Sequence, residues 1–423
     1  MSLFNGLFAG VNGINANGVA ISTLGDNIAN VNTVGYKSSR ASFEDILAGS
    51  QGGLGSRVAG VNQQFGQGGF ESTSSTTDLA IDGSGFFVVK NATDGSTYYS
   101  RAGQFNVNSD GYLVNPNGER LQGYLTNSSN AITAQVGDIQ VATTPVPPSK
   151  TASVTVVSNL SSNDAAAATF DPLNPTATSN FSTGVTVYDS LGNSRLVSVY
   201  FRKASTNNWE WYALADGGDL TSGTPGVNQI GEHGTLVYGT SGALSTTTFV
   251  TGSSSQFNFL GATQNQVINF NFGSSTSTGG TGLDGVTQFG SSSVLTNLTQ
   301  DGYASGSLKS IDITKDGTIT GTFTNGASHT LAQVATATFG NEEGLKRVGS
   351  NNFQATSDSG AAIVNAPAAG GRGGIVSSSL EQSNVDIASE LIKMVVFQRG
   401  FSANSRTISA INEMLGELVQ LGR

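Results

Sequence analysis

Residues 1–40 read MSLFNGLFAGVNGINANGVAISTLGDNIANVNTVGYKSSR, and the rest of the chain can be understood from them. Apolar positions recur alternately every three and four residues, which is the heptad spacing of a helix that packs lengthwise on another helix. The pattern stops at Asn32, and Gly35 follows, as expected after a helix end. The predicted contact residues, with Gly10 and Asn17 filling two further positions, are Leu3, Leu7, Ile14, Ile21, Leu24, Ile28 and Val31.

The last forty residues carry a matching pattern, whereas most of the intervening sequence has the composition of β-structure. Ser383 is the predicted N-cap of this closing helix, with Asp386 at its third helical position. We therefore expect the two ends of the chain to pair, with the middle as a long excursion between them. The predicted contact residues of the closing helix are Ile387, Leu391, Met394, Val395, Phe401, Ile408, Ile411, Leu415 and Leu418.

The first predicted helix is unusually rich in glycine, with five glycines between residues 6 and 25. Each interior glycine costs a helix roughly 1 kcal/mol relative to alanine, so five cost about 5 kcal/mol. An isolated helix does not tolerate that cost, so we expect this segment to become helical only when partners cover it. A helical hairpin within one monomer is the alternative. The glycine count and the broad apolar face of the closing helix favour assembly between copies instead.

Composition excludes several classes of protein. The chain has 423 residues, enough for about two to four domains, and it has no cysteine for disulfides, thiol catalysis or thiolate metal sites. Its net charge of −10 argues against nucleic acid as a partner. No run of eighteen apolar residues predicts a membrane span, and the start lacks the features of a cleaved signal peptide. Charged residues make up only 11%, which suits an extracellular β-protein in close self-contact.

The predicted fold class is mainly β with paired terminal α-helices, arranged as nested radial domains. Turn signals such as Asn117-Gly118 and a proline cluster at 145–148 divide the middle of the chain. A short helical piece is predicted at 41–48. The predicted domains are a terminal helical coiled coil (1–31 and 383–423), extended connecting segments (32–77 and 361–382), a β-domain (78–145 and 303–360) and an inserted outer β-domain (146–302).

No catalytic, cofactor-binding or metal-ligating constellation stands out, so we expect a protein that is not an enzyme and binds no cofactor. Residues 312–317 superficially resemble a calcium loop, but Phe323 occupies the position of the bidentate glutamate, so a hairpin turn is expected. His233 and His329 lack companions at metal-ligand spacing and are expected in exposed loops. Trp209 and Trp211 share one face of a predicted strand, which favours core packing over an aromatic sugar platform.

Residues 24–37, LGDNIANVNTVGYK, resemble the N-terminal signature of the bacterial flagellar rod and hook proteins, a pattern of the form NxANxxTxGYK. The closing segment SNVDIASELIKMVVFQRGFSANSRTISAINEMLGELVQL is similar to the terminal helix of that family, and DLAIDGSGFFVVK to the start of its β-domain. Residues 146–302 carry no matching motif. The residues that match the signature are Asn27, Ala29, Asn30, Thr33, Gly35, Tyr36 and Lys37.

Within this family, the length and the large insertion resemble the hook members rather than the shorter rod members. The resemblance implies an extracellular helical tube of many copies, a universal joint that passes torque from rod to filament. It also implies export through the flagellar type III channel without a cleaved leader. The implied partners are further copies of the chain, rod and hook–filament junction proteins, the hook cap and the export apparatus. The alternatives are a distal rod protein with an inserted domain and a surface adhesive or carbohydrate-binding β-protein.

Overall fold

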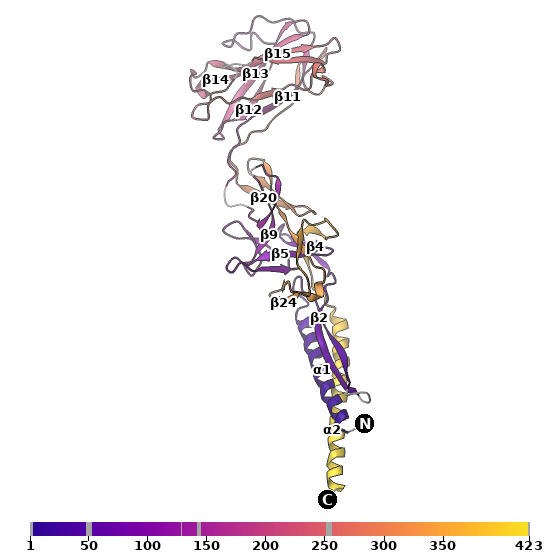
Figure 1. The fold of residues 1–423 in the computed structure, drawn as a ribbon. Helices are drawn as coiled ribbons and strands as arrows, with labels where there is room; N and C mark the ends of the chain where they lie inside the picture. The colour runs from indigo at the N-terminus through magenta and orange to yellow at the C-terminus, as the bar shows by residue number, and fades with distance from the viewer. Residues whose placement is uncertain (1–2, 48–52, 128, 142–144, 251–255, 422–423) are drawn as a thin grey trace. The chain divides into compact units, whose positions relative to one another are not determined.

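The computed structural model describes residues 3–47, 53–127, 129–141, 145–250 and 256–421 (Figure 1). The chain separates into two compact units, each described by itself below. The helix-bearing unit comprises Met1–Thr143, Lys309–Thr322 and Ser328–Arg423. The inserted unit comprises Thr144–Leu308 and Phe323–Ala327.

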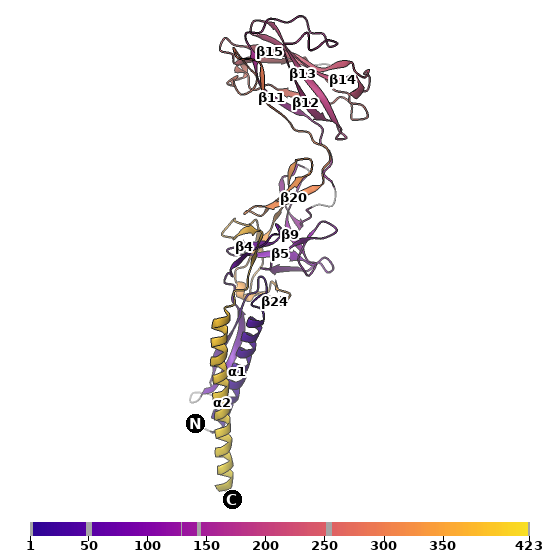
Figure 2. The same cartoon turned by 180° about the vertical axis from the view of Figure 1, so that it is seen from behind.

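Two long helices, α1 (Leu3–Ala29) and α2 (Ile387–Leu421), lie side by side in the helix-bearing unit and run in opposite directions (Figures 1 and 2). The helix α1 ends two residues before Val31, where the apolar pattern ends. The predicted N-cap of α2 is wrong, because the carboxylate of Asp386 accepts the backbone N–H of Ala388 and caps the helix, whereas Ser383 lies before it.

A β-hairpin follows α1 and packs along it. It consists of β1 (Ser39–Leu47) and β2 (Gly53–Gln63), paired antiparallel. The side-chain amide of Asn12 in α1 donates to the backbone oxygen of Leu54 at 2.8 Å. The helix predicted at 41–48 is therefore wrong over 41–47, and residue 48 lies outside the described residues. Pairing with β2 and packing on α1 outweigh the weak local preference of such a short segment for helix.

The remaining strands of the helix-bearing unit form two small two-stranded sheets and one large sheet whose main order is β20-β21-β22-β9-β5-β6-β25-β24. One short 3-10 helix, η3 (Glu342–Gly344), accompanies them. The strands are β3 (Phe70–Ser72), β4 (Leu79–Asp82), β5 (Phe86–Lys90), β6 (Thr97–Ser100), β7 (Asn106–Val107), β8 (Leu113–Val114), β9 (Arg120–Thr126), β10 (Ile132–Asp138), β20 (Leu308–Ile313), β21 (Thr318–Phe323), β22 (Ser328–Val334), β23 (Thr336–Thr338), β24 (Lys346–Gly349), β25 (Asn352–Gln354), β26 (Ile363–Asn365), β27 (Gly374–Ser377) and β28 (Ser379–Glu381).

The strand β5 separates two apolar cores because successive side chains of a strand point to opposite faces. Phe87 and Val89 belong to one core, and Phe86 and Val88 to the other. The hairpin turn expected at 312–317 is confirmed between β20 and β21, with Gly317 at φ +78°.

The inserted unit is a β-structure with a core of its own. A five-stranded antiparallel sheet runs in the order β12-β13-β14-β15-β16, and a four-stranded sheet is built around β11. Two 3-10 helices, η1 (Gly217–Asp219) and η2 (Thr276–Thr278), complete the unit. The strands are β11 (Ser153–Ser161), β12 (Phe181–Tyr188), β13 (Ser194–Ser205), β14 (Asn208–Asp216), β15 (Asn228–Tyr238), β16 (Leu244–Phe249), β17 (Asn269–Asn271), β18 (Thr287–Phe289) and β19 (Val294–Gln300).

Trp209 and Trp211 of β14 are fully buried in this core, and the indole N–H of Trp209 donates to the side-chain oxygen of Gln288 at 2.8 Å. Core packing of the two tryptophans is thus confirmed, so they form no surface platform for a sugar. The loop positions predicted for the histidines are wrong. His233 lies half-buried in β15, with its ring stacked on Tyr212, and His329 lies in β22.

Candidate assembly interface

The contact between α1 and α2 is made by small residues of α1. A Cβ on Gly10 would lie 2.8 Å from Cγ1 of Ile408, and one on Gly13 would lie 2.6 Å from the side-chain nitrogen of Asn404. Both distances are shorter than van der Waals contact allows, so a side chain at either position would force its neighbour on α2 to shift. Three of the five glycines that argued against an intramolecular hairpin, Gly6, Gly10 and Gly13, therefore lie in the contact that forms it, and that argument from the sequence is wrong.

The predicted contact residues of α1 differ in how far they are buried. Leu24 is buried, while the other described members of the set are only partly covered. The partly covered residues are Leu7, Ile14, Ile21, Ile28 and Val31. The side chain of Leu3 lies outside the described residues. The intramolecular contact thus follows the glycine and alanine face of α1 rather than its large apolar residues.

The predicted contact residues of α2 separate into two groups. Ile411 is buried and Ile408 lies against Gly10, while Met394 and Leu415 are partly covered. The side chain of Leu418 lies outside the described residues. The exposed members, each between 40% and 48% accessible, are Ile387, Leu391, Val395 and Phe401. A single chain therefore leaves nearly half of each of these apolar residues accessible to solvent.

Further exposed apolar residues extend these surfaces, and sequence reasoning missed them. On α1 they are Phe4, Phe8, Val11 and Val19. On α2 they are Ile392 and Val396. Their spacing of three or four residues was a usable signal, but the choice of a single heptad register hid it. Soluble monomers rarely expose contiguous apolar patches of this kind, which mark interaction surfaces.

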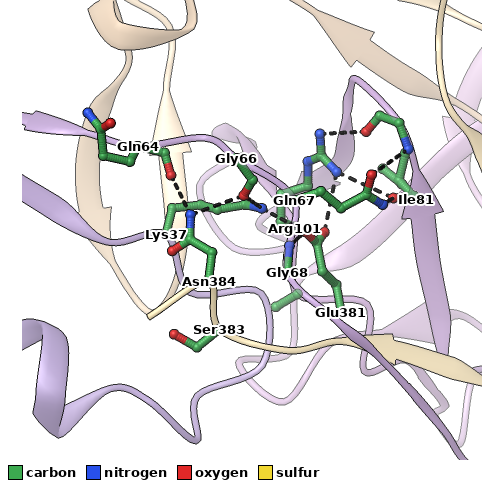
Figure 3. A network of polar contacts seen from close by, with 12 residues as sticks. Lys37, Gln64, Gly66, Gln67, Gly68, Ile81, Arg101, Glu381, Ser383 and Asn384 are labelled. Atoms are coloured by element: carbon green, nitrogen blue, oxygen red, sulfur yellow. Dashed lines mark hydrogen bonds and ion pairs between the residues drawn. The ribbon is translucent and has the colours of Figure 1, made fainter. Parts of the chain in front are cut away.

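A buried ionic cluster lies where the helices meet the β-strands (Figure 3). The ammonium of Lys37 donates to Oε1 of Glu381 at 2.6 Å and to the backbone oxygen of Gly66 at 2.8 Å. Nη1 of Arg101 donates to Oε2 of the same carboxylate at 3.3 Å. The Lys37 and Glu381 side chains are fully buried. Burial lowers the pKa of Lys37, and the neighbouring carboxylate opposes that shift.

Arg101 connects this cluster to the β-strands of the same unit. Its Nη2 donates to the backbone oxygen of Gly83 at 2.9 Å, and its guanidinium lies 5.3 Å from the centre of the Phe86 ring. The backbone N–H of Gly68 donates to Oε1 of Glu381 at 2.9 Å. The single carboxylate of β28 therefore holds together the segment after α1, the segment after β2 and the end of β6 (Figure 3).

Asn27 joins three elements through one side-chain amide. Its Nδ2 donates to the backbone oxygen of Ser39 and to Oε2 of Glu390, both at 2.8 Å, and its Oδ1 accepts the N–H of Ser39. The side chain is almost fully buried. Because α1, β1 and α2 each contribute a group, the amide fixes the base of the hairpin against both helices.

Gly35 and Tyr36 shape the turn after α1. Gly35 has φ +67°, and a Cβ there would overlap the backbone nitrogen of Ala102, so glycine is required. The Tyr36 hydroxyl donates to Asp26 at 3.2 Å, and the Arg347 guanidinium lies 5.0 Å from the ring centre. Burial raises the pKa of Tyr36.

The remaining signature residues have local roles. The hydroxyl of Thr33 donates to the side-chain oxygen of Asn30 at 3.2 Å, which closes the turn that follows α1. Ala29 is the last residue of α1 and is exposed. The structure thus gathers Asn27, Gly35, Tyr36 and Lys37 into one buried polar junction. Their partners at positions 101 and 381 were missed, because no local pattern links residues so far apart in sequence.

A groove of about 600 Å³ opens beside this junction, between α1, α2 and the start of β1. Its lining includes Leu24, Arg40 and Phe397. Among the residues that the structure describes, no three histidine, aspartate or glutamate side chains gather as a metal site. Within the same residues, neither helix is long and apolar enough to cross a membrane.

Comparison with known proteins gives full-length matches. The chain is 34% identical over 419 residues to the flagellar hook protein FlgE of Escherichia coli, covering 97% of this chain and 98% of the relative. It is 32% identical over 452 residues to the flagellar hook protein FlgE of Borreliella burgdorferi, and this match covers 99% of this chain and 100% of that relative. The chain belongs to the flagellar hook protein family.

Family models agree along the chain. They match a flagella basal body rod protein at 7–37, a flagellar hook protein FlgE/F/G D1 domain at 80–159, a flagellar basal body protein FlaE D2 domain at 159–303 and a flagellar basal body rod FlgEFG protein C-terminal region at 376–421. The crystal structure of Helicobacter pylori flagellar hook protein FlgE2 aligns with a TM-score of 0.51 at 14% identity, covering 72% of this chain and 98% of that one. This likeness shows a shared mainly β fold. The hook protein family is structural, and its members are components of the flagellum.

Proposed function

We propose that this chain is the subunit of a flagellar hook that polymerises into an open, flexible tube and passes torque from rod to filament. Full-length similarity to hook proteins supports the identity of the assembly. The observation that carries the polymeric mechanism is the uncovered apolar surface on both terminal helices. A contact between two different patches, repeated by a rotation that does not close, generates an open helix of subunits.

The terminal helices form the inner, channel-facing layer of the proposed tube. The exposed residues predicted for assembly then make contacts between copies, because a single chain leaves nearly half of each accessible. They are Ile387, Leu391, Val395 and Phe401. In the same proposal the β-strands of the helix-bearing unit form a middle layer and the inserted unit an outer layer. The layers then follow the nested order of domains expected from the sequence.

The small charged fraction of the chain, 11%, suits surfaces that slide during bending. Short polar side chains and few ion pairs leave little to fix the register between copies. In the proposal the tube stands outside the cell, and its subunits pass through the flagellar export apparatus. The tube meets rod proteins at one end and junction proteins at the other. A cap covers the growing end.

Electron microscopy of the purified full chain after polymerisation tests this proposal. Concentrated ammonium sulfate is a suitable trigger because excluded salts strengthen apolar burial. Short, curved tubes are expected. Straight, stiff rods would instead indicate a distal rod protein, and the absence of any ordered polymer over a range of salt and protein concentrations would contradict the proposal.

A further inference from the structure

The apolar surface of α1 lies on the side of the helix that faces away from α2. Phe4, Phe8 and Val11 each precede by two residues a glycine that lies against α2. The three glycines are Gly6, Gly10 and Gly13. Two residues of an α-helix correspond to a rotation of about 200°, so the aromatic side chains lie opposite the contact. We call Phe4, Phe8 and Val11 the aromatic patch.

The apolar surface of α2 also faces away from its partner helix. Glu390 contacts α1 through Asn27, and Ile392 follows it by two residues, which again places it on the opposite side. Leu391, Val395 and Val396 are exposed around it. We call the set Leu391, Ile392, Val395 and Val396 the aliphatic patch. The two patches thus lie on opposite faces of one helix pair.

The patches also lie at opposite ends of the helix pair. Gly6 lies against Ile411 and Gly10 against Ile408, so the aromatic patch is beside the late turns of α2. Asn27 bonds to Glu390, so the aliphatic patch is beside the late turns of α1. The separation is roughly seventeen helical residues, which at a rise of 1.5 Å corresponds to about 25 Å along the pair.

Two complementary apolar patches on opposite faces and opposite ends cannot meet within one chain, but they meet between copies in a head-to-tail arrangement. Residues 3–25 carry no charge, so the aromatic patch can approach an apolar surface without desolvating an ion. We propose that the aromatic patch of one copy packs on the aliphatic patch of a neighbouring copy, staggered by about 25 Å. This proposal rests on the proposed function and adds to it the contacting surfaces and their register.

Cysteine cross-linking of the full chain tests the register, since the natural sequence has no cysteine. The double variant Val11→Cys with Ala388→Cys places two small thiols at matching positions of the two patches. Within one chain these positions are about 27 Å apart along the helices, far beyond the Cα–Cα distance of roughly 7 Å that a disulfide spans. After polymerisation and mild oxidation, a ladder of covalent multimers is expected, because a head-to-tail contact propagates.

The matched control is Val19→Cys with Ala388→Cys. Val19 is also an exposed valine of α1, but it lies eight residues, or about 12 Å, from the proposed register. The control is expected to give polymers without the ladder. Equal cross-linking of both pairs, polymers without cross-links, or covalent products that stop at dimers would each overturn the proposal. Because electron microscopy reports polymers independently, such results would leave the proposed function standing.

A second variant needs no cross-link. Phe8→Ala is expected to raise the critical concentration for polymerisation at least tenfold, since large buried aromatics dominate interface energies. The control is Leu173→Ala, which truncates an exposed leucine of the inserted unit. It should change the critical concentration less than threefold. An unchanged critical concentration for Phe8→Ala would contradict the proposed contact even if the cysteine variants failed to polymerise.

Discussion

The ammonium of Lys37 is buried against Glu381 and the backbone oxygen of Gly66, where water cannot replace either partner. Replacing Lys37 by methionine keeps most of the length of the side chain and removes the ammonium group with its charge. Glu381 then keeps only Arg101 and the N–H of Gly68 as donors. Breaking a buried ion pair from one side costs about 3–5 kcal/mol, and the remaining donors favour the lower end of that range.

We therefore expect Lys37→Met to lower the free energy of unfolding of the helix-bearing unit by about 3 kcal/mol, measured by denaturant unfolding of the monomer. The matched control is Arg57→Met, which removes an exposed arginine that pairs with Glu44. The control should lower the free energy of unfolding by less than about 1 kcal/mol. Equal losses in the two variants would show that burial of the Lys37 pair has no special weight.

Glu232 makes the stability of the inserted unit depend on pH. Its buried carboxyl accepts the N–H of Ile268 at 3.1 Å, and burial raises its pKa from 4.5 to about 7. The folded state then holds a proton that the unfolded state releases above pH 4.5. Stability falls as pH rises from about 4.5 to about 7, by about 3 kcal/mol in total, and then levels off.

Thermal unfolding of the full chain between pH 4 and pH 8 measures this effect on the transition of the inserted unit. Glu232→Gln should remove most of the slope. Glu343→Gln, which neutralises an exposed glutamate of the helix-bearing unit, should leave it in place. A slope that survives in Glu232→Gln would mean that another group titrates in this range.

At the scale of the elements, glycines of α1 differ in what surrounds them. A side chain on Gly13 would meet Asn404, whereas a Cβ on Gly18 has nothing within 4 Å. Gly13→Leu should cost about 1–3 kcal/mol by overpacking the helix contact. Gly18→Leu should gain up to about 1 kcal/mol of helix propensity. Denaturant unfolding of the two monomers compares them directly, and gains of equal size in both variants would show that the two glycines act only through helix propensity.

The elements were predictable where a long periodic pattern existed. Both helices follow from the spacing of apolar residues over about seven turns or more, and the burial of Trp209 and Trp211 follows from strand alternation. The hairpin of β1 and β2 could not be predicted in this way, because the segment ASFEDILA is short and its partner strand is rich in glycine. The buried pair of Lys37 and Glu381 joins residues 344 positions apart, a contact that no local rule in a single sequence encodes.

The register of the helix contact shows a second limit. The heptad pattern selected one set of large apolar residues, but it did not say which of them meet within a chain and which stay exposed. Steric room decides which residues meet within a chain, because the two helices approach each other closely where a glycine lies in the contact, at Gly10 and Gly13 of α1 and at Gly400 of α2. The larger side chains are thereby displaced to the outer faces of the pair. A glycine on a predicted helix should therefore be considered first as a position of close helix contact, and only then as a residue that lowers helix propensity.

At the scale of the whole molecule, the proposed polymer uses residues other than those that hold the monomer. The glycine contact and the buried polar junction hold the monomer, whereas the proposal assigns the outer faces of the helices to contacts between copies.

Leu391→Asp distinguishes these two sets of residues, because Leu391 is 48% exposed and lies in the aliphatic patch. A charge there costs the monomer little, but in a buried contact between copies it lacks a partner and costs several kcal/mol. The variant should therefore unfold like the natural protein and yet fail to form tubes, as checked by denaturant unfolding and by electron microscopy. The control Leu283→Asp places the same charge on an exposed leucine of the inserted unit and should still give tubes. Normal tubes from Leu391→Asp would remove the aliphatic patch from the assembly, and loss of the monomer fold would show that the same residue also stabilises the single chain.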